Sequence, residues 1–270
     1  MVTALALAAL VPMAAAESGK PSMAASCELS DGYGVGVEAF AQEAEACLSE
    51  PLPEALETAA KDLLTLADRS RAKAGLAPLE RRTSLDRAAR AHALDMAANG
   101  YAAHGDRHGR THSERVQIMD RTGIYGTMGA NVIVVEAGTD AVRLYGLLMS
   151  DPVNSDNMLR KTFTHGGIGF AEADGKLFVT QLFGRLDGEL SEPLPIGLPP
   201  IADVDVTFTD ENLAFTEWRL EDAEGRRVRR GTFKAMKRSG GETGDLALIV
   251  EADTGGALYA LSGPAMSAGT

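Results

Sequence analysis

A proline-rich segment divides this sequence into two parts that differ in the spacing of their apolar residues. Residues 190–200 read Leu-Ser-Glu-Pro-Leu-Pro-Ile-Gly-Leu-Pro-Pro, with four prolines in eleven positions. Because proline fixes φ and donates no backbone hydrogen bond, this segment favours extended backbone and predicts a linker over 187–200. Apolar residues recur at helical spacing before the linker and alternate with period two after it. The sequence therefore predicts an α/β domain followed by a small all-β module.

The part before the linker predicts helices on both sides of a short antiparallel sheet. Apolar residues within 56–67 follow the period of an amphipathic helix, which Gly75 ends. A second helix starts with Thr83 or Ser84 as its N-cap and closes at Asn99. The shorter predicted elements are helices at 113–121 and 139–149 and strands at 131–135, 167–171 and 177–183. Together these elements predict an α-β-α sandwich.

The part after the linker predicts a β module over residues 201–270. A module of about 70 residues buries too little apolar surface to be stable alone, so we expect it to lean on the first domain. The predicted strands lie at 204–208, 213–220, 226–233, 246–250 and 257–261.

The N-terminal residues predict export. Residues 1–16 contain no charged side chain, and the alanines at 14–16 are the small residues that precede a signal-peptidase cut. Because no Lys or Arg precedes the apolar run, an irregular N-terminal helix is the alternative. Cys27 and Cys47 are the only cysteines, and in an exported protein they predict one disulfide within the N-terminal segment 17–52. Two free buried thiols are the alternative.

Charge and hydropathy exclude two classes of protein. The chain has 26 basic and 38 acidic residues, and its net charge of −12 disfavours nucleic-acid binding. No apolar run reaches the ~18–20 residues of a membrane-spanning helix. One basic run predicts a solvated edge strand, with a surface for an anionic envelope polymer as the alternative. Its arginines are Arg226, Arg227, Arg229 and Arg230.

Six segments of the first domain occur in an order typical of one family. Gly129-Ala130-Asn131-Val132 stands where that family has Gly-Glu-Asn-Ile, and residues 151–159 stand where it has Ser-Pro-Gly-His-Arg-x-Asn-Ile-Leu. The other four segments are the helices 64–76 and 85–96 and the strands 167–170 and 179–184. Residues 63–184 thereby resemble the CAP superfamily of cysteine-rich secretory proteins, antigen 5, plant pathogenesis-related proteins and their short bacterial relatives. The resemblance implies an α-β-α sandwich of CAP type over 53–186.

The resemblance also implies a cleft in which two histidines and two acidic residues converge, where some members bind a divalent metal. His104 matches the first histidine and Glu114 the first acid, whereas Ala130 and Asn154 replace the second acid and the second histidine. We expect His104, Glu114, Asn131 and Asn154 to line this cleft. Because zinc requires three or four ligands and only His104 and Glu114 remain, we expect no cofactor, with weak zinc binding as the alternative.

The remaining histidines allow a second metal hypothesis. His104, His108 and His112 would collect zinc or copper with Glu114, and the alternative is a set of solvated loop histidines. His92 lies on the apolar stripe of the second helix and predicts a hydrogen-bonded core histidine. His165 predicts an exposed side chain.

These features predict an exported bacterial CAP-type protein, secreted or periplasmic, that binds rather than catalyses. The sequence has no Gly-x-Ser-x-Gly nucleophile elbow. The resemblance suggests lipids, sterols or partner proteins, so the expected ligand is a small apolar molecule or a partner protein. The alternative is a metal-dependent, peptidase-like hydrolase that uses His104 and Glu114. A structural envelope protein that acts through the β module is a third hypothesis.

Overall fold

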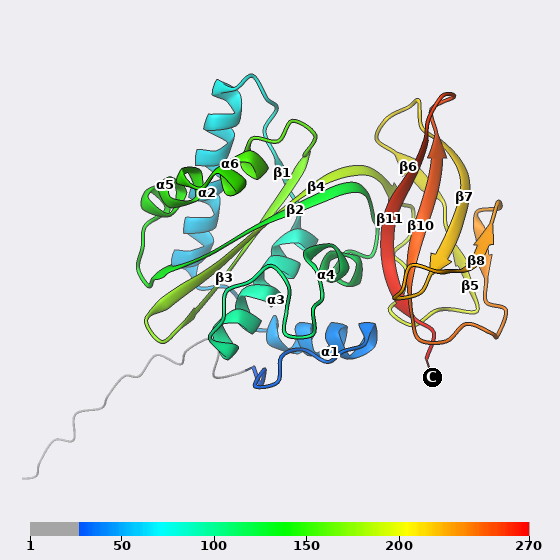
Figure 1. Cartoon of the computed structure of the whole chain (residues 1–270), viewed down its shortest axis with the longest axis horizontal. Helices are drawn as coiled ribbons and strands as arrows, with labels where there is room; N and C mark the ends of the chain where they lie inside the picture. Colours follow the sequence, from blue (N-terminus) through cyan, green and yellow to red (C-terminus); the bar gives the residue numbers. More distant parts are fainter. Residues whose placement is uncertain (1–26, 270) are drawn as a thin grey trace, which may run out of the picture.

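A long pair of antiparallel strands forms the centre of the first domain in this computed structural model, which describes residues 27–269. β2 (Gly123–Glu136) pairs with β4 (Lys176–Leu190) along almost its whole length. β3 (His165–Ala173) pairs with the other edge of β4, and β1 (Glu80–Arg81) ends this side of the sheet (Figure 1). The three strands predicted before the linker are therefore confirmed, and each of them is longer than predicted.

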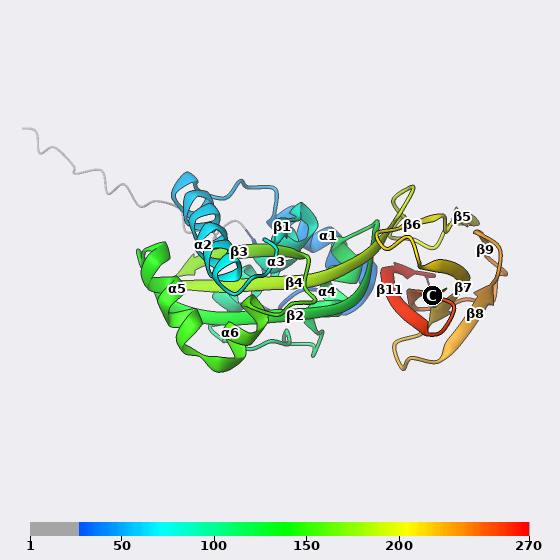
Figure 2. The same ribbon diagram turned by 90° about the horizontal axis from the view of Figure 1, so that it is seen from above.

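Helices cover both faces of this sheet, as Figures 1 and 2 show. One face carries α2 (Glu54–Lys73), α5 (Ala141–Ser150) and α6 (Pro152–Met158), whose apolar side chains share one core with the sheet. The opposite face carries α1 (Val37–Cys47), α3 (Thr83–Asn99) and α4 (His112–Met119). This layering confirms the predicted α-β-α sandwich.

Two glycines of β3 let α3 pack directly on the strand. A Cβ atom at Gly169 would lie 2.0 Å from the backbone nitrogen of Arg90, and one at Gly167 would lie 2.5 Å from the backbone carbon of Leu85. Any larger residue would push the helix away from the sheet. The Gly-x-Gly pattern of this strand is therefore a packing requirement, and it fixes the position of the Arg90 backbone.

The structure shifts two predicted helix starts and adds two helices. Thr83 is the first residue of α3, so neither Thr83 nor Ser84 is its N-cap, and the Ser84 hydroxyl instead donates to Asp120. Asp140, rather than Thr139, caps α5. The sequence analysis missed α1 and α6. The first follows a glycine-rich turn, and the second has seven residues, too few to show a helical period.

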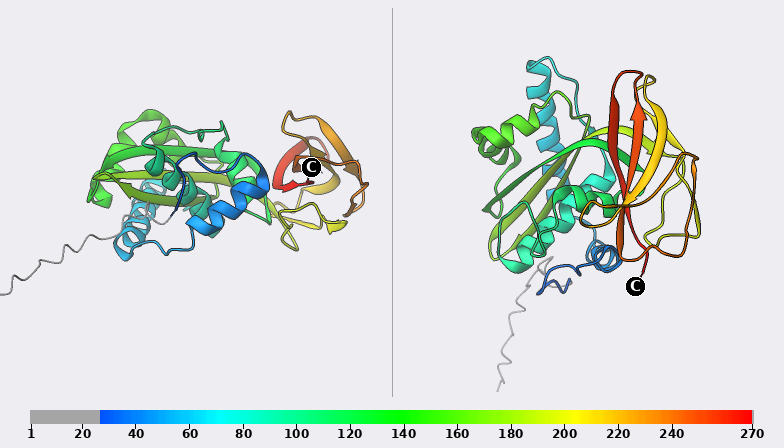
Figure 3. Two further views of the ribbon diagram at one scale, coloured as in Figure 1. Left: turned by 90° about the horizontal axis from the view of Figure 1, so that it is seen from below. Right: turned by 45° about the vertical axis from the view of Figure 1, so that its right-hand side comes forward.

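The C-terminal module extends the same sheet beyond β2. β11 (Leu258–Ser267) meets β2 at the pair Ser262↔Tyr125. The other strands follow in the order β10 (Asp245–Asp253), β7 (Ala214–Glu221) and β8 (Arg227–Gly231) (Figures 1 and 3). Three short strands, β5 (Ile201–Asp203), β6 (Val206–Phe208) and β9 (Ala235–Lys237), complete the module. The predicted all-β module is confirmed.

The proline-rich segment is extended and belongs to the core of the module. Leu190, Leu194 and Leu198 are buried among the apolar side chains of the C-terminal strands. Backbone hydrogen bonds fix the segment at Leu194 N to Arg121 O (3.0 Å) and at Ser267 N to Ile196 O (2.7 Å). Because β4 also continues to Leu190, the two parts of the chain are joined by ordered structure.

Arg121 connects the first domain to the module through backbone carbonyls. Its Nε and Nη2 atoms donate to Leu194 O (2.8 Å) and Pro195 O (2.9 Å). Its Nη1 atom donates to Ala265 O of β11 and to the last turn of α4. Burial lowers the pKa of Arg121 to about 10, which leaves the guanidinium charged at neutral pH. One side chain therefore holds α4, the proline-rich segment and β11 together.

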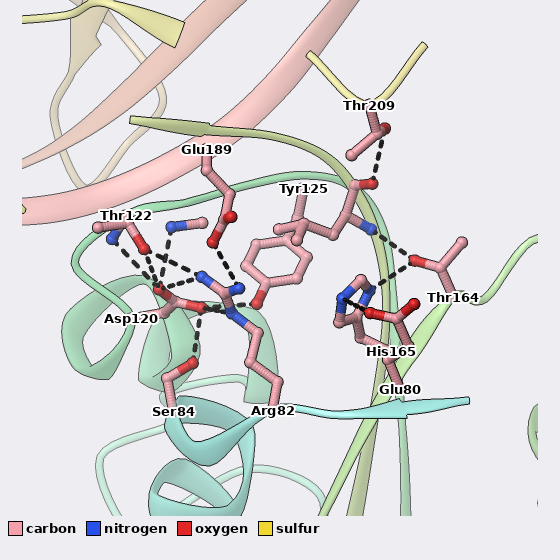
Figure 4. Close-up of polar contacts among 12 residues, drawn as sticks. Glu80, Arg82, Ser84, Asp120, Thr122, Tyr125, Thr164, His165, Glu189 and Thr209 are labelled. Carbon is pink, nitrogen blue, oxygen red and sulfur yellow. Dashed lines mark hydrogen bonds and ion pairs between the residues drawn. The ribbon is translucent and has the colours of Figure 1, made fainter. Parts of the chain in front are cut away.

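A second set of polar contacts, the Asp120 cluster, lies where α4 leads into β2 (Figure 4). The Asp120 carboxylate is 3% exposed and accepts hydrogen bonds from Arg82 Nε (2.6 Å) and Tyr125 Oη (2.6 Å). Hydrogen bonds and the Arg82 charge hold the pKa of this carboxyl well below its ordinary value against the opposing effect of burial. The remaining donors are Arg82 Nη2, Ser84 Oγ, Gly123 N, and the backbone N and Oγ1 of Thr122.

His165 lies near this cluster and is not exposed, so that prediction is wrong. Its side chain is 14% exposed, because its ring contacts Thr164 Oγ1 at 2.9 Å and Glu80 Oε2 at 3.4 Å (Figure 4).

A disulfide joins Cys27 to Cys47 at the end of α1, with 5.0 Å between the two Cα atoms. The predicted bridge is therefore confirmed. The predicted signal peptide, residues 1–16, lies outside the described residues. No helix within 27–269 is both long enough and apolar enough to cross a membrane.

Candidate functional site

His104 lies in the loop between α3 and α4 with an exposed side chain. Its backbone carbonyl accepts a hydrogen bond from Arg115 Nη2 at 2.8 Å. Within residues 27–269, no side chain forms a hydrogen bond or ion pair with its imidazole. The structure thus fixes the His104 backbone through Arg115 and leaves the ring exposed to solvent.

Glu114 forms the N-terminal capping box of α4. Its Oε2 atom accepts hydrogen bonds from Thr111 N (2.7 Å) and Thr111 Oγ1 (2.7 Å), and Thr111 Oγ1 accepts one from Glu114 N (3.3 Å). This reciprocal pattern satisfies two backbone N–H groups that the first helical turn leaves free. The carboxylate is therefore engaged in stabilising the helix, and only Oε1 faces away from the cap without a described partner.

Asn131 is buried and fully hydrogen-bonded within the domain. Its Nδ2 atom donates to Asn154 O (3.0 Å) and Gln181 Oε1 (3.0 Å), and its Oδ1 atom accepts from Asn157 Nδ2 (2.9 Å). These contacts attach α6 to β2 and β4. Asn154 contributes its backbone carbonyl to this network, while its side chain is half-buried.

Two positions that the CAP resemblance places around the cleft, 130 and 154, lie on opposite faces of the sheet. Ala130 packs with residues of α3 and α4, including Leu85 and Val116, whereas Asn154 belongs to α6 on the opposite face. No hydrogen bond or ion pair joins the side chains of His104, Glu114 and Asn154. Across the described part of the chain, no three His, Cys, Asp or Glu side chains are close enough to hold a metal ion.

Two other histidines are neutral because they are buried near Arg115. His92 is fully buried, and its Nε2 atom lies 2.8 Å from Ala103 O, so the predicted core histidine is confirmed. Burial and the Arg115 charge lower the pKa of His92 to about 3 and that of His112 to about 4. Both rings therefore stay uncharged at neutral pH and preserve the packing of α3 against α4.

A groove of about 530 Å³ separates α4 from the outer face of the C-terminal sheet; we call it the α4–β10 groove. Gln117 and Ile118 of α4 form one wall, and Ala247, Ile249 and Ala265 form the opposite floor. The small side chains of the floor leave space beside the helix. The mouth also carries an apolar residue, Val35, whose side chain is 71% exposed.

Two carboxylates in this groove have no basic partner among residues 27–269. Asp245 Oδ2 accepts a hydrogen bond from Val37 N (3.0 Å) at the start of α1, and Glu114 caps α4. The other charged groups of the groove are compensated, since Arg110 pairs with Asp106, Glu221 with Arg219 and Asp222 with Arg226. The groove therefore combines apolar and polar side chains and carries a net negative charge. Of the four expected cleft residues, only Glu114 lines it.

The basic run of the module is largely paired with acidic side chains. Arg227, on the edge strand β8, has no acidic partner in the described part of the chain. The charge available for an anionic polymer is therefore smaller than the sequence indicates. The ion pairs are Arg226 with Asp222 and Glu224, Arg229 with the buried Glu242, and Arg230 with Glu217.

Sequence reasoning missed the groove because its floor comes from the solvent side of β10. Asp245, Ala247 and Ile249 alternate with the core residues of that strand. This alternation is visible in the sequence and predicts a second face. It does not predict that a helix more than 120 residues earlier stands opposite that face.

Residues 64–183 match the cysteine-rich secretory protein family, CAP. The Bacillus subtilis protein YkwD, described as uncharacterized, is 28% identical over 134 residues, which are 49% of this chain and 50% of that protein. The chain thus spans about half the length of the curated relative that it matches.

Three solved structures are similar to parts of this chain. An outer surface protein from Borrelia burgdorferi has a TM-score of 0.40 and 20% identity, covering 47% of this chain and 91% of that one. An extracellular protein containing an SCP domain from Bacillus anthracis has a TM-score of 0.42 and 23% identity, covering 50% and 45%. A cysteine-rich secretory protein from Staphylococcus aureus has a TM-score of 0.38 and 16% identity, covering 50% and 41%.

Proposed function

Residues 64–183 form a CAP domain, and from this premise we propose that the chain is an exported, non-catalytic protein that binds a small apolar ligand in the α4–β10 groove. The groove is the observation that carries this proposal. Its volume of about 530 Å³ lies within the range of small-molecule sites. The exposed Val35 at its mouth gives a ligand apolar surface to cover.

The electrostatics of the groove narrow the class of ligand. Glu114 and Asp245 each leave one carboxylate oxygen without a described partner. An ammonium or guanidinium group on an apolar body would pair with these oxygens, whereas an anionic ligand would be repelled. The favoured ligand is therefore apolar and neutral or cationic.

The absence of a catalytic role is supported by the placement of the four expected cleft residues. Glu114 is engaged in a helix cap, Asn131 in an internal network, and the ring of His104 has no described partner. A general base requires a positioned side chain within hydrogen-bond reach of its substrate and usually an orienting partner. Nothing in the arrangement of residues 27–269 favours the hydrolase alternative.

Export is supported by two features that agree with each other. The charge-free segment 1–16 with its small residues resembles a signal peptide, and the Cys27–Cys47 disulfide is stable in an oxidising compartment. These features support a location in the periplasm or the extracellular space.

Native mass spectrometry of the exported protein, purified without detergent, tests this proposal. Ala247→Trp fills the floor of the groove, and Ala214→Trp, at an exposed position of β7 outside the groove, is the matched control. We expect a small ligand to co-purify with the wild-type chain and with Ala214→Trp, and to be lost from Ala247→Trp.

Two results would contradict the proposal. If Ala247→Trp retains the ligand, the groove is not the binding site. If the protein hydrolyses peptides in a zinc-dependent way that His104→Ala and Glu114→Gln abolish, the hydrolase alternative is correct. If a peptide segment of a partner protein co-purifies in the groove instead of a small molecule, the ligand is a partner protein and the proposed small apolar ligand is wrong.

A further inference from the structure

A second cavity, of about 430 Å³, lies on the α1–α3 side of the molecule and shares no residue with the α4–β10 groove. Leu48 and Leu52, which follow α1, form one apolar wall, and Ile168 of β3 forms another. The polar part of the lining consists of three arginines, two carboxylates and one hydroxyl: Arg81, Arg87, Arg90, Glu57, Asp86 and Thr83. We call this space the Arg90 cavity.

Two of these three arginines are neutralised by acidic side chains. Arg81 Nη1 donates to Glu57 Oε1 (2.9 Å), and Arg81 Nε donates to Asp86 Oδ2 (2.7 Å). Arg87 forms an ion pair with Glu45. Arg90 forms no ion pair and no side-chain hydrogen bond with any residue in 27–269. It is therefore the one uncompensated cation of the cavity within the described part of the chain.

The Arg90 guanidinium is also partly removed from solvent. Its Nε atom is buried and has no hydrogen-bond acceptor among residues 27–269. Burial lowers the pKa of Arg90, and Glu50 acts on it only through its electrostatic field. The nearby Tyr33 is 1% exposed, and its hydroxyl has no partner among these residues either. Buried donors without acceptors are rare because each costs free energy, so the unpaired Nε atom of Arg90 in the cavity lining indicates a missing acceptor.

The position of this arginine is rigid. The Arg90 backbone packs directly on Gly169, where even a Cβ atom would not fit. The disulfide at Cys47 holds the segment that carries Leu48. The Arg90 backbone and the segment that carries Leu48 are therefore held in place, which limits the ordering cost when a ligand binds.

We propose that the Arg90 cavity binds a small organic anion with a compact apolar body, through its carboxylate or phosphate-monoester group. The planar guanidinium presents parallel N–H donors that match either oxyanion in two contacts. Leu48, Leu52 and Ile168 cover the apolar body. This site goes beyond the proposed function, because it lies apart from the α4–β10 groove and selects an anionic ligand rather than a neutral or cationic one.

Titration calorimetry of the exported, oxidised chain with three matched probes tests the proposal. The probes are 4-phenylbutyrate, 4-phenylbutanol and 4-phenylbutylamine, which share one apolar body and differ in the charge of the head group. We expect the carboxylate to bind at least tenfold more tightly than the alcohol, since a hydrogen bond to a charged group contributes about that factor. The amine should not bind in this cavity. Phenethyl phosphate then distinguishes a phosphate-monoester ligand from a carboxylate.

Arg90→Met and Arg69→Met are the paired variants. Arg69 is exposed on α2 and lines neither cavity. We expect Arg90→Met to weaken phenylbutyrate binding at least tenfold and to leave Tm unchanged or higher, because an unpaired, partly buried charge is removed. Arg69→Met should change neither quantity.

Three outcomes would overturn the proposal. The first is equal affinity for the carboxylate and the alcohol, the second is full affinity in Arg90→Met, and the third is no binding of either anion at millimolar concentration. A large fall in Tm of Arg90→Met with unchanged affinity would show that the arginine is structural. None of these results depends on the α4–β10 groove, which the Ala247→Trp variant tests separately.

Discussion

Replacing Asp120 with asparagine removes one negative charge from a buried cluster without changing the shape of the side chain. The asparagine would still accept hydrogen bonds at its Oδ1 atom, but its amide group would face the donors Arg82 and Tyr125 (Figure 4). Breaking a buried pair costs about 3–5 kcal/mol. Arg82 retains Glu189 as a partner at 2.7 Å and is 16% exposed, so we expect the lower end, about 3 kcal/mol.

The expected decrease in Tm is roughly 6–12 °C, at about 2–4 °C per kcal/mol for a chain of this size. The pH dependence provides a second readout. The pKa of Asp120 is depressed in the folded state, so its contribution is complete above the ordinary value of 3.8 and is lost as the pH falls below it. The difference between wild type and Asp120→Asn should therefore be constant from about pH 7 to 5 and should shrink below about pH 4.

Asp140→Asn is the matched control for this prediction. Asp140 caps α5 through Arg143 N at 2.8 Å, and asparagine is an equivalent N-cap, so its Tm should change by less than about 2 °C. Thermal unfolding followed by circular dichroism at several pH values measures both variants. The reasoning is refuted if Asp120→Asn loses no more stability than Asp140→Asn, or if its deficit at pH 3 equals that at pH 7.

Two further predictions concern the junction and the buried histidine. Arg121→Met leaves five backbone carbonyls without their donor and should lower the free energy of unfolding by about 3 kcal/mol. The variant should also be cleaved faster within residues 191–200 in limited proteolysis. An unchanged cleavage rate would contradict the role of Arg121 in holding this segment. Because the folded-state pKa of His92 is about 3, below its ordinary value of 6.5, the unfolded state binds more protons and stability should fall as the pH drops from about 6.5 towards 4. His92→Gln, which keeps a donor for Ala103 O, should flatten this part of the denaturation-midpoint curve measured in urea, and an unaltered slope would show that other groups cause it.

The helices and strands were predictable wherever a segment is long enough for the periodic spacing of its apolar residues to be detected. Leu56, Leu63 and Ala67 recur on one face of α2 and are buried as that spacing requires. Gly100 ends α3 in the left-handed conformation, as an Asn-Gly pair indicates. By contrast, α6 has seven residues, and the segment before α1 reads as a turn. Such short helices are stabilised by tertiary contacts, for example the bonds from Asn131 and Asn157, which no local pattern reveals.

At the candidate site, the role that the CAP resemblance gives to a residue can differ from the role that its neighbours in the sequence give it. Glu114 occupies the position of a cleft acid, yet Thr111-His112-Ser113-Glu114 is also the sequence signature of a capping box. The capping box could have been predicted from these four residues alone, because both partners are local. Asn131 presents the opposite case, since its three partners come from α6 and β4 and were not predictable from the strand that carries it.

The α4–β10 groove depends on contacts that span most of the chain, and this dependence has a consequence for the β module. The hydrogen bond from Val37 N to Asp245 joins residues 208 positions apart, and Arg121 fixes β11 against α4. Removing the module would therefore delete the floor of the groove and leave Ile118 and the end of α4 exposed to water. The first domain of this chain without its module would lack the groove altogether. The module thus forms one half of the groove, and α4 of the first domain forms the other half.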